Sequence, residues 1–219
     1  MTSKPRPKAP KATIAPRKRP RQERARATVE AVLDATAHVL RDQGYDGLTT
    51  NKVADAAGVS VGSLYQYFPG KDALVIAVLL RYAEHQHATF LAALTKVAMA
   101  PIPVVIDTLI DVLSEQQESD PQLAFVLMNQ IPRVGEMGEV IAYHEEKIAV
   151  PLHSFLVSRK DDLADLDLRA ATFLLTHAIP PLLQRMRISR PTKEQRRAVF
   201  RELRRMLVAY FTGSGFLLV

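Results

Sequence analysis

Residues 44–72 read GYDGLTTNKVADAAGVSVGSLYQYFPGKD, and this stretch decides the fold of the N-terminal part of the chain. Gly44 is expected to stop the helical pattern that precedes it, because a glycine commonly follows the last turn of a helix. Thr49 and Thr50 can cap a new short helix through their hydroxyl groups. Val53 and Ala57 then fall on one side of that helix, at helical spacing.

A second short helix follows within the same stretch. Gly58 permits a tight turn, and Ser60 can cap the next helix. Leu64 and Phe68 are four residues apart and therefore lie on the same face of this helix. The Pro-Gly pair at residues 69–70 ends it.

Two short helices joined by a glycine turn predict a helix-turn-helix. The alternative is an ordinary helical hairpin inside a core. That alternative leaves several residues of the second helix without a role in packing, although their side chains suit a DNA surface. They are Val61, Gly62, Ser63, Tyr65, Gln66 and Tyr67.

The stretch resembles the DNA-binding domain of the tetracycline-repressor (TetR) family. The shared pattern is G-Y-x-x-L-T-T-x-x-V-A-x-x-A-G-V-S-x-G-x-L-Y-x-Y-F-x-x-K-x-x-L over residues 44–74, and the resemblance covers roughly residues 25–75. It implies a dimer whose second short helix enters the major groove of a pseudo-palindromic operator.

The resemblance also assigns residues to DNA contacts by their position in the motif. Those that it places on phosphates are Thr49, Thr50, Tyr65, Tyr67 and Lys71. Those that it places on base edges are Asn51, Val61, Gly62, Ser63 and Gln66. Phosphate contacts fix the register on the duplex, whereas contacts with base edges read its sequence.

Positive charge is concentrated at the N-terminus. The net charge of the 219 residues is +6, but residues 1–26 hold ten Lys or Arg and one acid, so the other 193 residues carry 19 bases and 22 acids. Residues 1–22 are rich in proline, lysine and alanine, which predicts a disordered basic arm. We expect the arm to contribute to DNA affinity. A solvated tail without defined contacts is the alternative.

The rest of the chain reads as all α, with about nine helices and no convincing strand. We expect a helix-turn-helix DNA-binding domain at residues 23–70, built from three helices, and a larger helical domain for effector binding and dimerisation at residues 71–219. A long helix should begin at Lys71 and link the two. The last two helices, beginning near Leu168 and after Thr192, are expected to form a four-helix dimer interface, with monomer core as the competing interpretation.

The larger domain carries no transferable motif, so its ligand pocket is predicted only from large or amphipathic residues. For each residue alone, plain core is the competing interpretation. The candidates are Met99, Phe125, Met128, Tyr143, His144, Phe155, Phe173 and His177.

Other classes of protein are disfavoured by what the sequence lacks. It has no cysteine, no Gly-rich phosphate loop and no HExxH pattern, so we expect neither an enzyme nor a metal or cofactor site. No stretch reaches 18 uninterrupted apolar residues, and no apolar region follows the N-terminal charges as in a secretory signal, so we expect a cytoplasmic protein.

The sequence therefore predicts a DNA-binding transcriptional regulator. The favoured hypothesis is a repressor released from its operator by a small apolar or amphipathic ligand. The alternative is a ligand-independent or activating regulator of the same fold.

Overall fold

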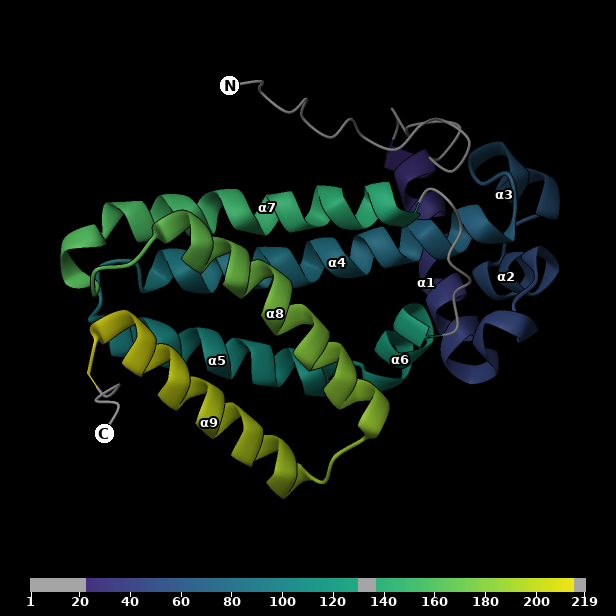
Figure 1. Ribbon diagram of the computed structural model, residues 1–219. Coiled ribbons are helices and arrows are strands. Elements are labelled where there is room, and N and C mark those ends of the chain that lie inside the picture. Colours follow the sequence, from purple (N-terminus) through teal and green to yellow (C-terminus); the bar gives the residue numbers. More distant parts are fainter. Residues whose placement is uncertain (1–22, 130–136, 215–219) are drawn as a thin grey trace. The chain divides into compact units, whose positions relative to one another are not determined.

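The computed structural model describes residues 23–129 and 137–214, with the backbone alone for Arg24 and for residues 128, 129 and 137–145. These residues form nine α-helices and a short 3-10 helix, and they contain no strand, which confirms the all-α prediction (Figure 1). The α-helices are α1 (Glu23–Gly47), α2 (Thr50–Ala57), α3 (Val61–Tyr67), α4 (Lys71–Lys96), α5 (Ile102–Ser119), α6 (Pro121–Asn129), α7 (Met137–Ser158), α8 (Leu168–Ser189) and α9 (Lys193–Thr212).

Two glycines shape the N-terminal helices. Gly44 has φ 67° and ψ −173°, so the helix geometry is interrupted there, three residues before α1 ends at Gly47. Gly58 adopts the left-handed conformation, with φ 66° and ψ 30°, and its N–H donates to the carbonyls of Ala54 and Asp55. A side chain is strained at such positive φ values. Both glycines therefore act as the sequence predicts.

α8 and α9 both begin with side-chain caps. Asp167 accepts hydrogen bonds from the backbone N–H groups of Arg169 and Ala170, at 2.9 and 3.1 Å. Thr192 and Gln195 form a reciprocal capping box at the start of α9. The 3-10 helix Lys160–Asp162 lies between α7 and α8.

The described helices divide into two compact units. Unit 1 contains the described residues of Met1–Glu84 and Gln122–Tyr143, and unit 2 contains those of His85–Pro121 and His144–Val219. α4 runs from one unit into the other, because the division falls between Glu84 and His85 in the middle of this helix.

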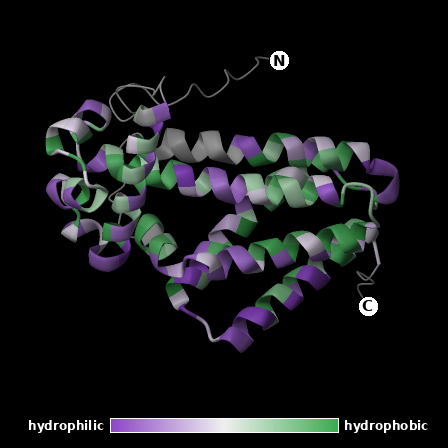
Figure 2. Ribbon diagram, turned by 180° about the vertical axis from the view of Figure 1, so that it is seen from behind, coloured by the Kyte–Doolittle hydropathy of each residue, from purple (hydrophilic) through white to green (hydrophobic). Residues whose placement is uncertain are grey.

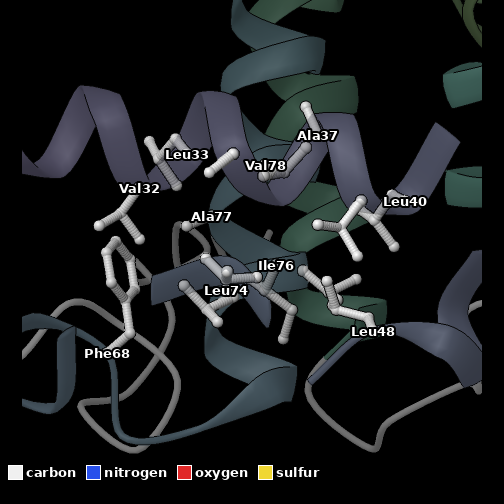
Figure 3. Close-up of a cluster of buried hydrophobic side chains, with 14 of the residues drawn as sticks. Val32, Leu33, Ala37, Leu40, Leu48, Phe68, Leu74, Ile76, Ala77 and Val78 are labelled. Atoms are coloured by element: carbon white, nitrogen blue, oxygen red, sulfur yellow. The ribbon is translucent and has the colours of Figure 1, made fainter. Parts of the chain in front are cut away.

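The core of unit 1 joins α1, α2, α3, α4 and α6. Leu64 of α3 and the C-cap residue Phe68 are fully buried. Figure 3 shows the ring of Phe68 directed toward Val32 of α1, with Leu74 of α4 in the same cluster. Val53 of α2 is buried in this cluster too, so two short helices are anchored to two long ones by apolar side chains.

The core of unit 2 joins α5, α7, α8 and α9. Ile106, Leu156, Ala171 and Phe200 are buried members of it, one from each helix. α9 lies alongside α5 (Figure 1). The guanidinium of Arg204 on α9 bridges two carboxylates of α5, at 2.7 Å each, and these carboxylates are Asp107 and Asp111.

One arginine secures the turn after α4. Arg159 donates to the carbonyls of Ala98 and Ala100, at 2.5 and 3.0 Å, and pairs with Asp162 at 2.6 Å. Its side chain is 11% exposed. A single guanidinium thus satisfies two carbonyls that no helix pairs.

Hydrophobic and hydrophilic residues alternate along most of the described helices (Figure 2). Across residues 23–129 and 137–214, no helix is long and apolar enough to cross a membrane.

Truncation of Leu64 should destabilise the protein strongly. Leu64→Ala removes a fully buried side chain from the centre of the unit 1 core, so we expect the free energy of unfolding to fall by about 2–5 kcal/mol. Urea denaturation followed by circular dichroism measures this change. The matched control is Gln66→Ala on the exposed side of the same helix, which should stay within about 0.5 kcal/mol of wild type. Equal effects of the two substitutions would contradict the assigned packing.

Candidate nucleic-acid interface

The interface is built on α2 and α3, whose first turns are both capped by hydroxyl groups. Thr49 accepts from the backbone N–H of Lys52 at 3.3 Å, and Ser60 accepts from that of Ser63 at 3.1 Å. These bonds satisfy donors that a helix start leaves without partners. The predicted caps at Thr49 and Ser60 are therefore confirmed.

α3 has a buried side and an exposed side. Leu64 is buried, whereas Tyr65 and Gln66 are exposed, with 43% of Tyr65 accessible. Gly62 is exposed too, and a Cβ at this position would meet only the Ser60 Oγ, at 3.9 Å. The packing of α3 leaves this side open.

The five residues predicted to contact bases come from two helices. Asn51 is exposed on α2, and Gly62 and Gln66 are exposed on α3. Val61 and Ser63 are half-buried, because Val61 packs against the core of unit 1 and the Ser63 hydroxyl lies 2.8 Å from that of Ser60.

Two of the predicted phosphate-contacting residues meet each other. The Thr50 hydroxyl lies 3.4 Å from the Tyr65 hydroxyl, so α2 and α3 present these groups side by side. Thr49 is exposed at the N-cap of α2. Tyr67 is half-buried and packs against the core of unit 1. Lys71 is the first residue of α4, where the positive end of the helix dipole also attracts anions.

Tyr45 and Asp72 are part of the site, although the motif does not mark them for DNA contact. The Tyr45 hydroxyl donates to Asp72 Oδ1 at 2.7 Å, and Lys71 Nζ lies 4.0 Å from the centre of the Tyr45 ring. One aromatic side chain at the end of α1 thus touches the first two residues of α4. The sequence signal was an aromatic residue directly after Gly44, and only the fold brings it to Lys71.

The surroundings of Tyr45 keep its hydroxyl protonated. Burial, the hydrogen bond to Asp72 and the negative charges of Asp72 and Asp46 raise the pKa of Tyr45 to about 12. A raised tyrosine pKa stabilises the folded state fully below the unfolded value near 10, and this stabilisation is lost as the pH rises through 12. The hydroxyl therefore remains a hydrogen-bond donor throughout the physiological pH range.

The interface itself carries little positive charge. Residues 44–72 contain two lysines and three aspartates. One lysine, Lys52, is engaged locally, because its Nζ donates to Gln43 Oε1 at 2.5 Å and to the Gly47 carbonyl at 2.8 Å. Attraction to a polyanion must therefore rely on Lys71, on helix N-termini and on charge elsewhere in the chain.

The predicted pocket residues are spread over the chain. Phe125 belongs to unit 1, whereas Met99, Phe155, Phe173 and His177 belong to unit 2. The side chains of Met128, Tyr143 and His144 lie outside the described residues.

Within unit 2 the candidates do not share one environment. Met99 lies in the turn after α4 and is 89% exposed, while Phe155 packs against the core. Phe173 and His177 stack on each other on the exposed side of α8, with ring centres 4.1 Å apart. None of them lines the surface hollow of about 540 Å³ on α9, whose lining includes Arg201, Arg204 and Arg205. The described residues contain no cluster of His, Asp or Glu that could hold a metal ion.

Comparisons with known proteins place both parts of the chain. A family model described as "Bacterial regulatory proteins, tetR family" matches residues 32–78, and one described as "Tetracyclin repressor-like, C-terminal domain" matches residues 101–211.

Among curated proteins, the HTH-type transcriptional repressor KstR of Mycobacterium tuberculosis is 41% identical over 59 residues, which are 27% of this chain and 27% of that protein. The tetracycline repressor protein class D of Escherichia coli is 37% identical over 65 residues, 28% of this chain and 30% of that protein. The matched segments thus span less than a third of these relatives.

Solved structures share the fold over most of the chain. A TetR transcription regulator from Haloarcula marismortui has a TM-score of 0.67 at 22% identity, covering 84% of this chain and 98% of that one. The fatty acid degradation regulator FadR from Bacillus halodurans has a TM-score of 0.64 at 19% identity, covering 87% and 96%. At these identities the likeness concerns the fold alone.

The Tyr45 hydroxyl should resist ionisation at alkaline pH. With a pKa of about 12, Tyr45 should be about one per cent ionised at pH 10, where a free tyrosine is about half ionised. The difference in phenolate absorbance between wild type and Tyr45→Phe at pH 10 measures this fraction. Half ionisation of Tyr45 in the folded protein would show that its surroundings do not favour the protonated hydroxyl.

Proposed function

The chain belongs to the TetR family of bacterial regulatory proteins, and from this membership we propose that it is a sequence-specific DNA-binding transcriptional repressor released by a small ligand. The observation that carries the proposal is the two-sided α3. Leu64 and Phe68 hold this helix to the core, while Tyr65 and Gln66 are left exposed beside capped helix N-termini.

In this proposal α3 lies in the major groove. Gln66 can pair with an adenine edge, and the Val61 side chain can touch a thymine methyl group. Ser63 and Asn51 supply further polar groups, and Gly62 allows the backbone to come close to a base. The exposure of Asn51, Gly62 and Gln66 supports this assignment.

The phosphate contacts flank this helix. The hydroxyls of Thr50 and Tyr65 are close enough to bind a common phosphate, and Lys71 adds a positive charge at the start of α4. Thr49 and Tyr67 complete the set. Because residues 44–72 carry few positive charges, the basic arm at residues 1–22 supplies much of the non-specific attraction to DNA in this proposal.

We propose a homodimer formed through α8 and α9, so that two copies of α3 read two half-sites. Both helices expose large apolar side chains in the single chain, including Phe173 at 61% and Met206 at 62%. Leu174, Leu182 and Ile188 of α8 are exposed as well. Large apolar side chains exposed on two helices favour a surface that another protein covers. A second copy of this chain therefore accounts for the exposure of Phe173, a residue that the sequence alone placed among the pocket candidates.

Release from DNA would depend on an apolar or amphipathic effector bound by the larger domain. α4 is one helix that begins at the interface residue Lys71 and ends in unit 2. A change in its tilt would alter the spacing of the two reading helices in a dimer. The effector needs only to favour the non-binding state by a few kcal/mol. A cytoplasmic, non-enzymatic regulator fits this role.

Removal of the Tyr65 hydroxyl should weaken operator binding. Tyr65→Phe keeps the ring but removes a donor to a phosphate from both protomers of the dimer, so we expect affinity to fall about a hundredfold or more, since a hydrogen bond to a charged group contributes about 1.5–3 kcal/mol. Fluorescence anisotropy at physiological salt measures this, with a duplex enriched from random DNA by the wild-type protein.

The matched control is Tyr82→Phe on α4, which removes a tyrosine hydroxyl outside both the helix-turn-helix and the proposed dimer helices and should leave affinity unchanged. If both variants bound like wild type, the phosphate contact of Tyr65 would be refuted. If wild type enriched no sequence at all, the proposed function would fail.

A charge at the exposed apolar surface of α8 should prevent dimerisation. Phe173→Glu would bury a carboxylate in the proposed interface, which is strongly unfavourable without a partner charge. Light scattering coupled to size exclusion should report a monomer at micromolar concentration. Val104→Glu, at another exposed apolar position on α5, should remain dimeric. A dimer for both variants would place the interface elsewhere.

A further inference from the structure

Tyr45 joins the two residues that open α4. It follows Gly44, where regular helix geometry in α1 stops. Its ring packs against the core of unit 1 and also meets the ammonium group of Lys71, 4.0 Å from the ring centre. Its hydroxyl donates to Asp72 at 2.7 Å. The Tyr45 side chain thus has three contacts: its ring meets the core and the ammonium of Lys71, and its hydroxyl meets the carboxylate of Asp72.

The contact with the Tyr45 ring constrains the Lys71 side chain, which would otherwise be free to move. A lysine has four rotatable bonds, and ordering it on a ligand costs conformational entropy. An ammonium over the face of an aromatic ring is attracted by the ring quadrupole. Lys71 is therefore partly ordered before DNA arrives, and preorganisation of this kind strengthens binding.

The Tyr45 hydroxyl has a separate task. It donates a hydrogen bond to Oδ1 of Asp72, the residue that follows Lys71. This bond joins the carboxylate at the start of α4 to the tyrosine at the end of α1. The ring itself sets the direction of the Lys71 ammonium.

We propose that Tyr45 is a positioning residue of the DNA interface, whose ring holds the Lys71 ammonium in place for a phosphate of the operator backbone. The proposal rests on the DNA-binding function proposed above. It assigns to Tyr45 no contact with DNA of its own, and it makes Lys71 the residue through which Tyr45 acts.

The test is a double-mutant cycle on Tyr45 and Lys71, read by fluorescence anisotropy with the duplex enriched by wild-type protein. Tyr45→Leu should lower affinity about tenfold in the dimer, since each protomer loses the preorganisation of Lys71 toward its phosphate. Tyr45→Phe retains the ring and should stay within about twofold of wild type. In the Lys71→Ala background, Tyr45→Leu should change affinity less than about twofold, because the two residues act as one unit.

The salt dependence gives a second readout that a merely structural role would not move. The slope of log affinity against log salt should fall by about one per protomer for Tyr45→Leu, as for Lys71→Ala, because each loses one phosphate contact. In the free protein, the ring-current shift of the Lys71 side-chain protons should be present in wild type and Tyr45→Phe and absent in Tyr45→Leu.

The outcomes separate the two proposals. Equal losses for Tyr45→Leu in the wild-type and Lys71→Ala backgrounds would overturn the inference and leave Tyr45 as a packing residue. An unchanged salt slope would overturn it as well. A wild-type protein that enriches no sequence overturns both proposals, whereas specific binding with an additive cycle overturns only this one. If thermal denaturation shows Tyr45→Leu to be unfolded, Tyr45→Met, which fills the site without an aromatic face, takes its place in the cycle.

Discussion

The burial of Leu64 and Phe68 is the constraint on which the rest of the interface depends. Both are fully buried in the core formed with α1 and α4, and they hold α3 at one rotation about its axis. In a helix of 3.6 residues per turn, Gln66 then lies about 200° around from Leu64. The exposed side of α3 is therefore set by apolar packing on its opposite side, and a shift of that packing would turn a different set of residues outward.

Residues 44–72 carry little positive charge. Lysines are few between residues 44 and 72, and Lys52 is used within the fold to join Gln43 to the carbonyl of Gly47. What remains is geometry: capped helix starts, the neighbouring hydroxyls of Thr50 and Tyr65, and the Lys71 ammonium over the Tyr45 ring. Such an arrangement gives residues 44–72 little general affinity for DNA, because general affinity follows the number of phosphates neutralised.

Much of this fold could be predicted from the sequence, because local signals decide it. Gly44, Gly58, Thr49, Ser60 and Thr192 each have a backbone or capping role that their residue type predicts, and each has that role in the structure. The exposed side of α3 followed in the same way from the spacing of Leu64 and Phe68.

The sequence was less informative where residues distant along the chain meet. The contact of Tyr45 with Lys71 and Asp72 spans more than twenty residues, and no local pattern marks it. The pocket candidates were chosen by size and polarity alone. Those properties do not distinguish Phe155, which packs against a core, from Phe173, which is exposed on α8. The roles of the candidate site residues remain predictions.

The uninterrupted course of α4 has a consequence for how the molecule unfolds. The boundary between the two compact units falls inside this helix. If the part of α4 in one unit unfolds, the part in the other unit therefore becomes a free helix end. Helical hydrogen bonds link each turn to the next, and helix formation is cooperative along the chain. The two units should therefore melt together rather than one after the other. A molecule bound within unit 2 would raise the melting temperature of α2 and α3 as well, with no contact to them.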